Sequence, residues 1–428
     1  MTEPERYDRQ LRLWGAHGQR KLSQASICCF GSSAVACEVL KNLILPGIGS
    51  FVIVDDAKLT ERDFGQNFFV PPTASLGEFR GRVVLETLLQ LNPTVKGCFV
   101  QDVSDLDDEK FDVCIVSNFS MTQRIERIFN ACKYMVKLNS IGFIGRIACS
   151  MNQPHLILEA KSEEGRIEDF RLTNPWPELL AFANQSFTDD LYHVPYFVIL
   201  IKAAEIAKTH CRADLVQAIK SMAPVGMFEE LENFQQAVAN TYRITALVGD
   251  DQIVSDLKSM TTRPNLDNNF VTAIDAVIKF YEKNKCLPLF GSSLPDMASS
   301  SDMYTRLCGI YKEKALEDFY QVSNTDNEFV KLVIGNIRNI RVLTESAEDD
   351  LLDEEQKEIV EFFDSGKIGN LLGKEIERYE KGCELHSVSS VIGAVGAQEI
   401  VKLLTNQFTP IGKSFVFNGI NGTAFMTG

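Results

Sequence analysis

Residues 26–56 read SICCFGSSAVACEVLKNLILPGIGSFVIVDD, and the pattern of this stretch decides the fold. The segment SICCF predicts a short buried strand, which a glycine–serine turn follows. The next apolar residues recur at helical spacing until Pro46 and Gly47 end the helix, and SFVIV then predicts a second strand that ends at Asp55. Apolar strands joined by a helix are typical of a parallel sheet that is covered on both faces.

The same alternation extends beyond this stretch, with a helix predicted over residues 79–91 and a strand over 113–116. From about residue 165 helical periodicity dominates, and a strand is predicted again only near the end of the chain. We therefore predict a doubly wound α/β unit interrupted by a mainly helical insert. The predicted segments are residues 1–164, the helical residues 165–380, and residues 381–428, where the chain returns to the α/β unit.

Composition and charge narrow the class of protein. The chain has 428 residues, with 45% hydrophobic and 24% charged residues, which is the balance of a globular protein with a substantial core. Its net charge of -15 argues against nucleic acid or an anionic membrane surface as a partner. No apolar run approaches the roughly 20 residues of a membrane span. The opening MTEPERYDRQ does not have the order of a signal peptide.

The 11 cysteines are scattered, mostly in apolar runs, and no CxxC pair occurs. They are therefore interpreted as reduced thiols of a cytoplasmic or nuclear protein, and no structural metal site is expected. A thioester-forming cysteine should be exposed and activated by its surroundings. Cys211, Cys286, Cys308 and Cys383 lie in no recognisable active-site motif, so no catalytic cysteine is predicted.

The turn after the first strand has the framework of a nucleotide site but few of its glycines. Such a site needs a glycine-rich turn, a helix whose N-terminus faces phosphate, and an acid that ends the second strand. Of the G-x-G-x-x-G glycines only Gly31 remains, since Ser33 and Ala36 replace the other two, while Asp55 holds the position of the ribose-binding acid. The turn alone leaves open a working NAD, FAD or ATP site or a scaffold that no longer binds nucleotide.

The segment YDRQLRLWG, residues 7–15, resembles the opening of the inactive adenylation subunits in activating enzymes for ubiquitin-like proteins. The stretch LKNLILPGIGSF, residues 40–51, is similar to the neddylation branch of that family. Further agreement comes from QNFF at 66–69, HVPY at 193–196, LPDM at 294–297 and GAQEIVK at 396–402. The resemblance implies a Rossmann-like, ThiF/MoeB-type adenylation fold whose helical insert is similar to a catalytic-cysteine domain without its cysteine.

Catalytic members of the family carry D-x-D-x-V-x-x-S-N-L-N-R-Q-F after the second strand. Laid on this chain, that run keeps Asp55 but places Ala57 at the second acid and Gln66 at the arginine that contacts the ATP phosphates. Arg80 replaces a phosphate-binding lysine, and Phe119 falls on the acid that helps to hold magnesium. Charge that develops on phosphate must be met by cations and a metal. The resemblance therefore implies no cofactor in this chain, with ATP and magnesium bound by a partner subunit.

The matching N-terminal motif retains Arg9, and the resemblance implies that this residue acts in trans on the ATP of the partner. The alternative is that Arg9 and Arg12 face solvent or pair with Asp8 and Glu5. The expected partner is the catalytic subunit of a heterodimeric activating enzyme, with the ubiquitin-like modifier reached through the complex. That subunit is expected to carry both adenylation and thioester formation.

Pairing of two adenylation folds needs apolar surface on both, and two segments are candidates, residues 47–69 and 294–311. The predicted interface residues are Gly47, Ile48, Phe51, Phe64, Asn67, Phe68, Leu294, Met297 and Tyr304. The alternative for each of them is a place in the internal core. Rival functions are the regulatory subunit of the SUMO-activating enzyme, an NAD-dependent oxidoreductase, or a scaffold that supports no activation.

Overall fold

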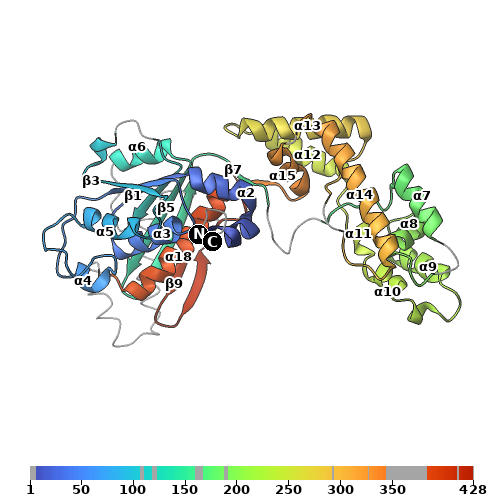
Figure 1. Ribbon diagram of the computed structural model, residues 1–428, viewed down its shortest axis with the longest axis horizontal. Coiled ribbons are helices and arrows are strands. Elements are labelled where there is room, and N and C mark those ends of the chain that lie inside the picture. The colour runs from blue at the N-terminus through green and yellow to red at the C-terminus, as the bar shows by residue number, and fades with distance from the viewer. Residues whose placement is uncertain are drawn as a thin grey trace. The chain divides into compact units, whose positions relative to one another are not determined.

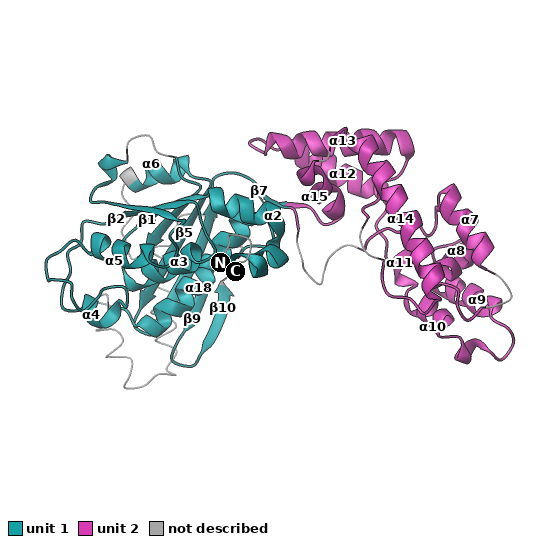
Figure 2. Ribbon diagram, viewed as in Figure 1, with its two compact units in different colours: residues 1–157, 342–428 teal, residues 158–341 magenta. Residues whose placement is uncertain are grey.

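A computed structural model of the chain describes residues 6–106, 110–117, 123–159, 167–187, 191–291, 294–325, 327–343, 383–411 and 414–427. The chain divides into two compact units, residues 1–157 with 342–428 and residues 158–341 (Figure 2). The first is built around a sheet and the second from helices, each with its own core (Figure 1). Both boundaries predicted from the sequence, 164/165 and 380/381, fall outside the described residues and stay predictions.

An eight-stranded sheet forms the centre of the first unit, in the order β10-β9-β6-β5-β4-β1-β2-β3. The strands are β1 (Ser26–Phe30), β2 (Ser50–Val54), β3 (Lys96–Val100), β4 (Val113–Ser117), β5 (Tyr134–Ile141), β6 (Ile144–Met151), β9 (Ser414–Asn418) and β10 (Thr423–Thr427). From β3 to β5 neighbouring strands are parallel, and from β5 to β10 they are antiparallel. The predicted α/β, Rossmann-like fold class is confirmed by this sheet.

Helices cover both faces of the sheet (Figure 1), because its strands bury side chains in both directions. In β1, Ile27 and Cys29 contribute to one apolar cluster, whereas Cys28 and Phe30 contribute to another. The first cluster includes side chains of α2 (Asp8–Gln24), α3 (Ala34–Ile44), α5 (Arg80–Leu89) and α18 (His386–Thr405). The second includes side chains of α6 (Gln123–Ala131). Two short helices, α4 (Asp63–Gln66) and η1 (Val103–Asp105), also belong to the unit.

Helices α3 and α18 pack closely although they lie at opposite ends of the sequence. A Cβ atom on Gly393 would lie 2.5 Å from the Cβ of Glu38, so this approach requires glycine. The hydroxyl of Ser389 on the same helix lies 2.9 Å from that of Ser140 in β5. By length and composition α18 could cross a membrane, but 67% of its most apolar stretch is buried inside the unit. It is the helix through which the returning chain completes the α/β unit.

The second unit is helical. Its helices are α7 (Pro177–Ser186), α8 (Tyr196–Ala207), α9 (Arg212–Met222), η2 (Phe228–Glu230), α10 (Glu232–Ala239), α11 (Tyr242–Thr245), α12 (Asp250–Thr261), α13 (Asn268–Asn284), α14 (Ser301–Val322) and α15 (Glu328–Asn336). The first six residues of α8, YFVILI, are all buried in its core. A buried ion pair joins the start of the unit to α14, with Nη2 of Arg171 2.7 Å from Oδ2 of Asp318. Strands β7 (His155–Ile157) and β8 (Arg341–Leu343), which lie at the two boundaries between the units, form a separate small sheet.

His155 predicts a pH dependence of stability. Its ring is buried, with Nδ1 3.0 Å from the hydroxyl of Tyr134. Burial, and to a smaller extent the charge of Lys21, lowers the pKa of His155 from 6.5 to about 4. Between these two pH values His155 is protonated in the unfolded chain and neutral in the folded chain. As the pH is lowered from about 6.5 to 4, the free energy of unfolding should therefore decrease. This group contributes at most about 1.4 kcal/mol per pH unit to the decrease.

Urea denaturation of His155→Asn over this pH range should show a smaller fall than the parent chain. The control is His210→Asn, which removes an exposed histidine of the second unit. An equal change of pH dependence in both variants would contradict the assignment to His155.

Candidate functional site

The turn from β1 into α3 lies at the carboxyl edge of the parallel strands, where Rossmann-like folds hold phosphate. Gly31 begins the turn with φ of +92°, a conformation that L side chains rarely adopt. Ser33 is at the N-cap of α3, but its side chain makes no capping hydrogen bond. Its hydroxyl instead lies 2.7 Å from that of Ser117 at the end of β4. The first amides of α3 therefore need another acceptor.

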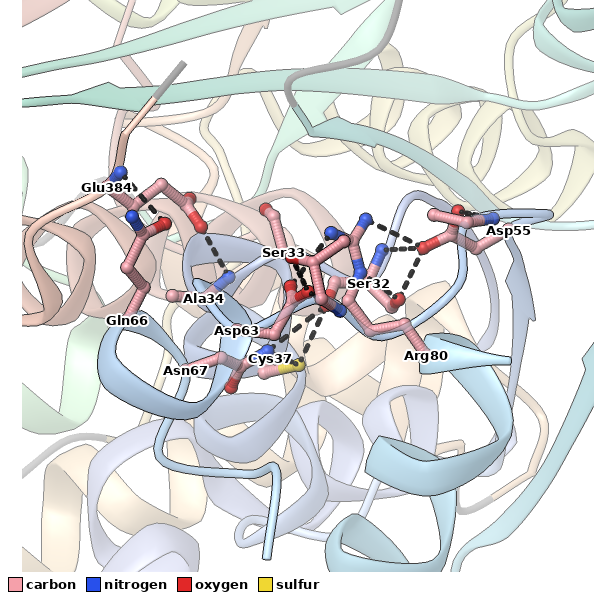
Figure 3. A network of polar contacts seen from close by, with 12 residues as sticks. Ser32, Ser33, Ala34, Cys37, Asp55, Asp63, Gln66, Asn67, Arg80 and Glu384 are labelled. Atoms are coloured by element: carbon pink, nitrogen blue, oxygen red, sulfur yellow. Dashed lines mark hydrogen bonds and ion pairs between the residues drawn. The ribbon is translucent and has the colours of Figure 1, made fainter. Parts of the chain in front are cut away.

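Glu384 supplies that acceptor (Figure 3). Its Oε2 accepts a hydrogen bond from the amide of Ala34 at 2.7 Å, and its Oε1 accepts one from the amide of Val35 at 3.2 Å. The backbone amide of Glu384 in turn donates to Oε1 of Gln66 at 3.3 Å. A carboxylate on these amides takes the position where a nucleotide phosphate meets the N-terminus of the helix.

Glu384 is 7% exposed, and this burial raises the pKa of its carboxyl group above the ordinary value. The hydrogen bonds from Ala34 and Val35 and the charge of Arg80 act in the opposite direction. The positive end of the α3 dipole therefore offsets part of the cost of burying this carboxylate. The helix N-terminus and the acid stabilise each other.

Asp55 ends β2 at the position of the ribose-binding acid, but its carboxylate already has partners in this chain. Oδ2 accepts a hydrogen bond from the amide of Ser32 at 3.0 Å and lies 3.0 Å from Nη2 of Arg80. The hydroxyl of Ser32 also donates to Oδ2, and the amide of Ala57 donates to Oδ1 at 2.9 Å. Asp55 is 1% exposed. Its oxygens are therefore turned toward the protein.

Arg80, at the start of α5, connects the two aspartates of the site. Its Nη1 lies 3.2 Å from Oδ1 of Asp63, and its Nε donates to the hydroxyl of Ser32 at 3.0 Å. Burial acts to lower the pKa of Arg80, but the charges of Asp55 and Asp63 and the hydrogen bonds to them raise it above its ordinary value. Two carboxylates thus contact one guanidinium, whose charge also acts on the carboxyl group of Glu384. This charge distribution disfavours an incoming phosphate.

Asn67 completes the network beneath the turn (Figure 3). Its amide nitrogen donates to the carbonyl of Ser32 at 3.2 Å and lies 3.4 Å from the sulfur of Cys37. Its side-chain oxygen accepts from the amide of Phe69 at 3.0 Å. Burial, partly opposed by the hydrogen bond from Asn67, raises the pKa of Cys37 to about 12. This thiol is therefore unreactive at neutral pH.

The structure brings together most residues predicted at the nucleotide position, and these are Gly31, Ser33, Ala36, Asp55, Ala57 and Gln66. Gln66, predicted in place of a phosphate-binding arginine, holds the backbone of Glu384. Phe119, predicted in place of a metal-binding acid, lies outside the described residues. In the part of the chain that the structure describes, no cluster of histidine, cysteine or acidic side chains is arranged to hold a metal ion.

Most of the predicted interface residues serve the core of this chain. Ile48, Phe51 and Asn67 are buried in the first unit, and Leu294 and Met297 are buried in the second. This corrects the interface prediction for these five, because a buried side chain has no surface to offer a partner. The apolar pattern of their segments results from internal packing.

Gly47 is also buried, and its φ of +84° explains why glycine occurs there. For the remaining three residues the interface assignment stays a prediction. Phe64 is half-buried, as is Tyr304, whose hydroxyl donates to the carbonyl of Leu294 at 2.8 Å. Phe68 is 72% exposed, with its ring stacked on His386 at 3.7 Å between centroids.

Arg9 and Arg12 differ in their surroundings, although both are exposed on α2. Arg12 forms an ion pair with Asp8 at 3.0 Å. Arg9 has no ion-pair or hydrogen-bond partner among the described residues, which begin after Glu5. Arg12 is therefore paired and Arg9 faces solvent, and both situations belong to the alternative considered for these arginines. The role of Arg9 in trans stays a prediction.

Sequence reasoning missed Glu384, the residue that fills the site. Glu384 and Ala34 are 350 positions apart in the sequence, and no local motif predicts their contact. The available signal was indirect. The first amides of a buried helix need an acceptor, and an acid just before the predicted returning helix was a candidate to supply one.

The sheet, the turn into α3 and the acid that ends β2 define a Rossmann-like fold. The model of the ThiF family matches residues 7–427, and the chain belongs to this family. It is similar to the NEDD8-activating enzyme E1 regulatory subunit of Caenorhabditis elegans, with 29% identity over 97% of each chain.

Two further relatives match over a similar length. The NEDD8-activating enzyme E1 regulatory subunit AXL of Arabidopsis thaliana is 29% identical over 98% of each chain. The NEDD8-activating enzyme E1 regulatory subunit of Saccharomyces cerevisiae is 27% identical over 98% of this chain and 99% of its own. Among solved structures, Escherichia coli MccB aligns with 34% of this chain and 45% of its own, at a TM-score of 0.29 and 19% identity.

The contact of Glu384 with α3 predicts destabilisation that an added anion reverses. Glu384→Ala leaves two buried amides without an acceptor, which should cost about 1–3 kcal/mol. Inorganic phosphate can then bind at the freed N-terminus. The melting temperature of Glu384→Ala should therefore be lower than that of the parent chain and should recover partly in millimolar phosphate.

Asn327→Ala is the matched control, because Asn327 caps α15 through the amides of Phe329 and Val330 at 2.9 and 3.3 Å. This variant should also melt earlier, at a cost of about 0.5–2 kcal/mol. Phosphate should restore it less, since Asn327 is uncharged and caps α15 at an exposed position, so that its removal frees no buried anion position. An equal effect of phosphate on both variants and the parent chain would contradict the assignment.

Proposed function

We propose that this chain is the regulatory subunit of a heterodimeric activating enzyme for the ubiquitin-like modifier NEDD8, and that it binds no nucleotide itself. The regulatory role is supported by similarity over nearly the whole chain to NEDD8-activating enzyme E1 regulatory subunits of three organisms. The lack of nucleotide binding is supported by one observation, the carboxylate of Glu384 on the first amides of α3.

The charges at this position support the same proposal. Adenylation requires cations and a metal to meet the charge that develops on the phosphates of ATP. Here the guanidinium of Arg80 is paired with Asp55 and Asp63. A triphosphate would have to displace Glu384 and separate these ion pairs. In this proposal ATP and magnesium are therefore bound by the catalytic subunit, which also forms the thioester with the modifier.

Arg9 is proposed as the contribution of this chain to the chemistry. A guanidinium presents a planar set of donors that matches phosphate oxygens. Arg9 is exposed, and it has no competing partner in the described part of the chain. It can therefore reach toward ATP held by the catalytic subunit. Phe68 and Phe64 are proposed to lie in the surface that this subunit covers, together with Tyr304 of the second unit.

The compartment and further partners are also proposals. All 11 cysteines are free thiols. A reduced state of this kind fits the cytoplasm, the nucleus or both. The net charge of -15 favours protein partners over nucleic acid and anionic membranes.

Reconstitution tests the assignment to the NEDD8 pathway. The chain should copurify with the catalytic subunit of a NEDD8-activating enzyme, and the pair should form an ATP-dependent thioester with NEDD8. The chain alone should form none and should not bind ATP or NADH in a fluorescence titration. Thioester formation with SUMO and its catalytic subunit instead would replace this proposal by the SUMO pathway, and tight NADH binding would replace it by an oxidoreductase.

Substitution of Arg9 tests its role in trans. If Arg9 donates to a phosphate oxygen, Arg9→Ala should slow ATP–pyrophosphate exchange by the heterodimer about 10- to 100-fold, the value of a hydrogen bond to a charged group. Arg12→Ala is the matched control, because it removes the same charge from the same helix at a residue already paired with Asp8. Equal exchange rates for the parent and Arg9→Ala heterodimers would refute the role.

A further inference from the structure

The first turns of α2 carry Arg9 but receive little support from the rest of that helix. Gly15 interrupts the helix with φ of +70° and ψ of 174°, so residues 8–14 form a short helical segment of their own. Within this segment only Trp14 is buried. A helix of this length is marginal without tertiary packing. Gln10 and Leu11 are half-buried between its ends, and hydrogen bonds to other parts of the unit hold both ends.

The C-terminal end of the segment is fixed through Trp14. Its Nε1 donates to the side-chain oxygen of Gln19 at 2.9 Å, and its backbone carbonyl accepts from Nε2 of Gln407 at 2.8 Å. Arg9 lies more than one helical turn before this anchor. The contacts of Trp14 therefore do not by themselves fix the direction of the turn that carries Arg9.

The N-terminal end is fixed through Tyr7, which occupies the N-cap position of α2. Its side chain makes no capping hydrogen bond to its own helix. The phenol instead accepts a hydrogen bond from Nδ2 of Asn92 at 3.0 Å and lies 3.4 Å from the hydroxyl of Thr94. Arg6 adds a contact to the same turn, from Nη2 to the carbonyl of Leu91 at 3.2 Å.

Asn92 is a rigid base for this contact, because its side chain is fully buried and bonded on both sides. Its Nδ2 also donates to the carbonyl of Ile44 at the end of α3, at 2.9 Å. Its Oδ1 accepts from the hydroxyl of Thr94 at 2.9 Å. The phenol of Tyr7 is thus attached to the core of the first unit.

Gly47 provides the space for the phenol. A Cβ atom at this position would lie 2.5 Å from the hydroxyl oxygen of Tyr7 and 2.8 Å from the ring carbon that bears it. The ring of Tyr7 therefore occupies a slot that any side chain at Gly47 would close. This contact and the positive φ of Gly47 together account for glycine at this position.

We propose that Tyr7 is a positioning residue for Arg9, in which the contact of its phenol with Asn92 and Gly47 fixes the first turn of α2 so that the guanidinium meets the partner's ATP. This inference rests on the proposed role of Arg9 in trans. Tyr7 itself touches no substrate. It acts by restricting the directions that Arg9 can take, and a displacement of about 1 Å at a charged catalytic group can cost up to about 100-fold in rate.

The test uses the reconstituted heterodimer and a double-mutant cycle of Tyr7→Phe and Arg9→Ala. Tyr7→Phe keeps the ring in its slot and removes only the hydroxyl. It should lower the turnover of ATP–pyrophosphate exchange about 3- to 10-fold, with unchanged melting temperature and unchanged affinity between the subunits. In the Arg9→Ala background the same substitution should have no further effect, because the group that it positions is gone.

A second measurement reports the geometry without activity. Amide hydrogen exchange of residues 8–14 should be faster in Tyr7→Phe than in the parent chain, while exchange in α3 and α18 stays the same. Tyr320→Phe is the matched control, because it removes an exposed phenol hydroxyl from the second unit and should change neither measurement.

The outcomes separate this inference from the proposed function. If Arg9→Ala leaves exchange unchanged, both the role in trans and the positioning by Tyr7 are refuted. If Arg9→Ala slows exchange while Tyr7→Phe does not, or if the two effects multiply, the role of Arg9 stands and the positioning by Tyr7 is refuted. If Tyr7→Phe lowers the melting temperature of the chain as well as its activity, the role of Tyr7 is merely structural. That result would also refute the positioning.

Discussion

The hydrogen bonds from Ala34 and Val35 to the carboxylate of Glu384 are the interaction on which the rest of the candidate site depends. They join the turn after β1 to the residue that leads into α18, across 350 positions of sequence. With this acceptor inside the protein, α3 keeps a satisfied N-terminus without a bound phosphate. Arg80 then has no phosphate to meet, and it pairs with Asp55 and Asp63. The contact of Glu384 with α3 and the ion pairs of Arg80 therefore depend on each other for a stable fold.

A Rossmann-like turn without a bound phosphate has more groups to satisfy than its missing glycines suggest. The exposed end of a helix dipole and a buried acid at the end of β2 remain as parts of the fold, and both are costly when unpaired. In this chain Glu384 pairs with the helix end, and Arg80 pairs with the acid at the end of β2. The sequence pattern alone does not identify either residue as such a partner. Gln66 holds the backbone of Glu384, and Arg80 neutralises Asp55. Through these internal contacts neither group is left unpaired.

The sequence predicts the framework well because the framework is set by local patterns. Strands β1 and β2 and the helix between them follow from apolar runs and from the break at Pro46 and Gly47. The same apolar pattern does not predict which residues form an interface. It cannot distinguish Ile48 and Phe51, which lie in the core, from residues that contact a partner. Glu384 could not be predicted from spacing at all. Its importance arises only when the returning chain brings it to α3.

Gly47 shows how the two regions of the first unit are connected. It follows the C-terminal end of α3, the helix whose N-terminus Glu384 caps, and its lack of a side chain admits the phenol of Tyr7. The same α/β core thus accepts the chain's own carboxylate at one end of α3 and holds the segment that bears Arg9 at the other. A core that binds ATP would need cations at its own turn, whereas this core leaves an unpaired arginine, within its described residues, on the outside. Filling the internal site and presenting an external guanidinium are therefore compatible uses of one helix, as the proposed role of Arg9 requires.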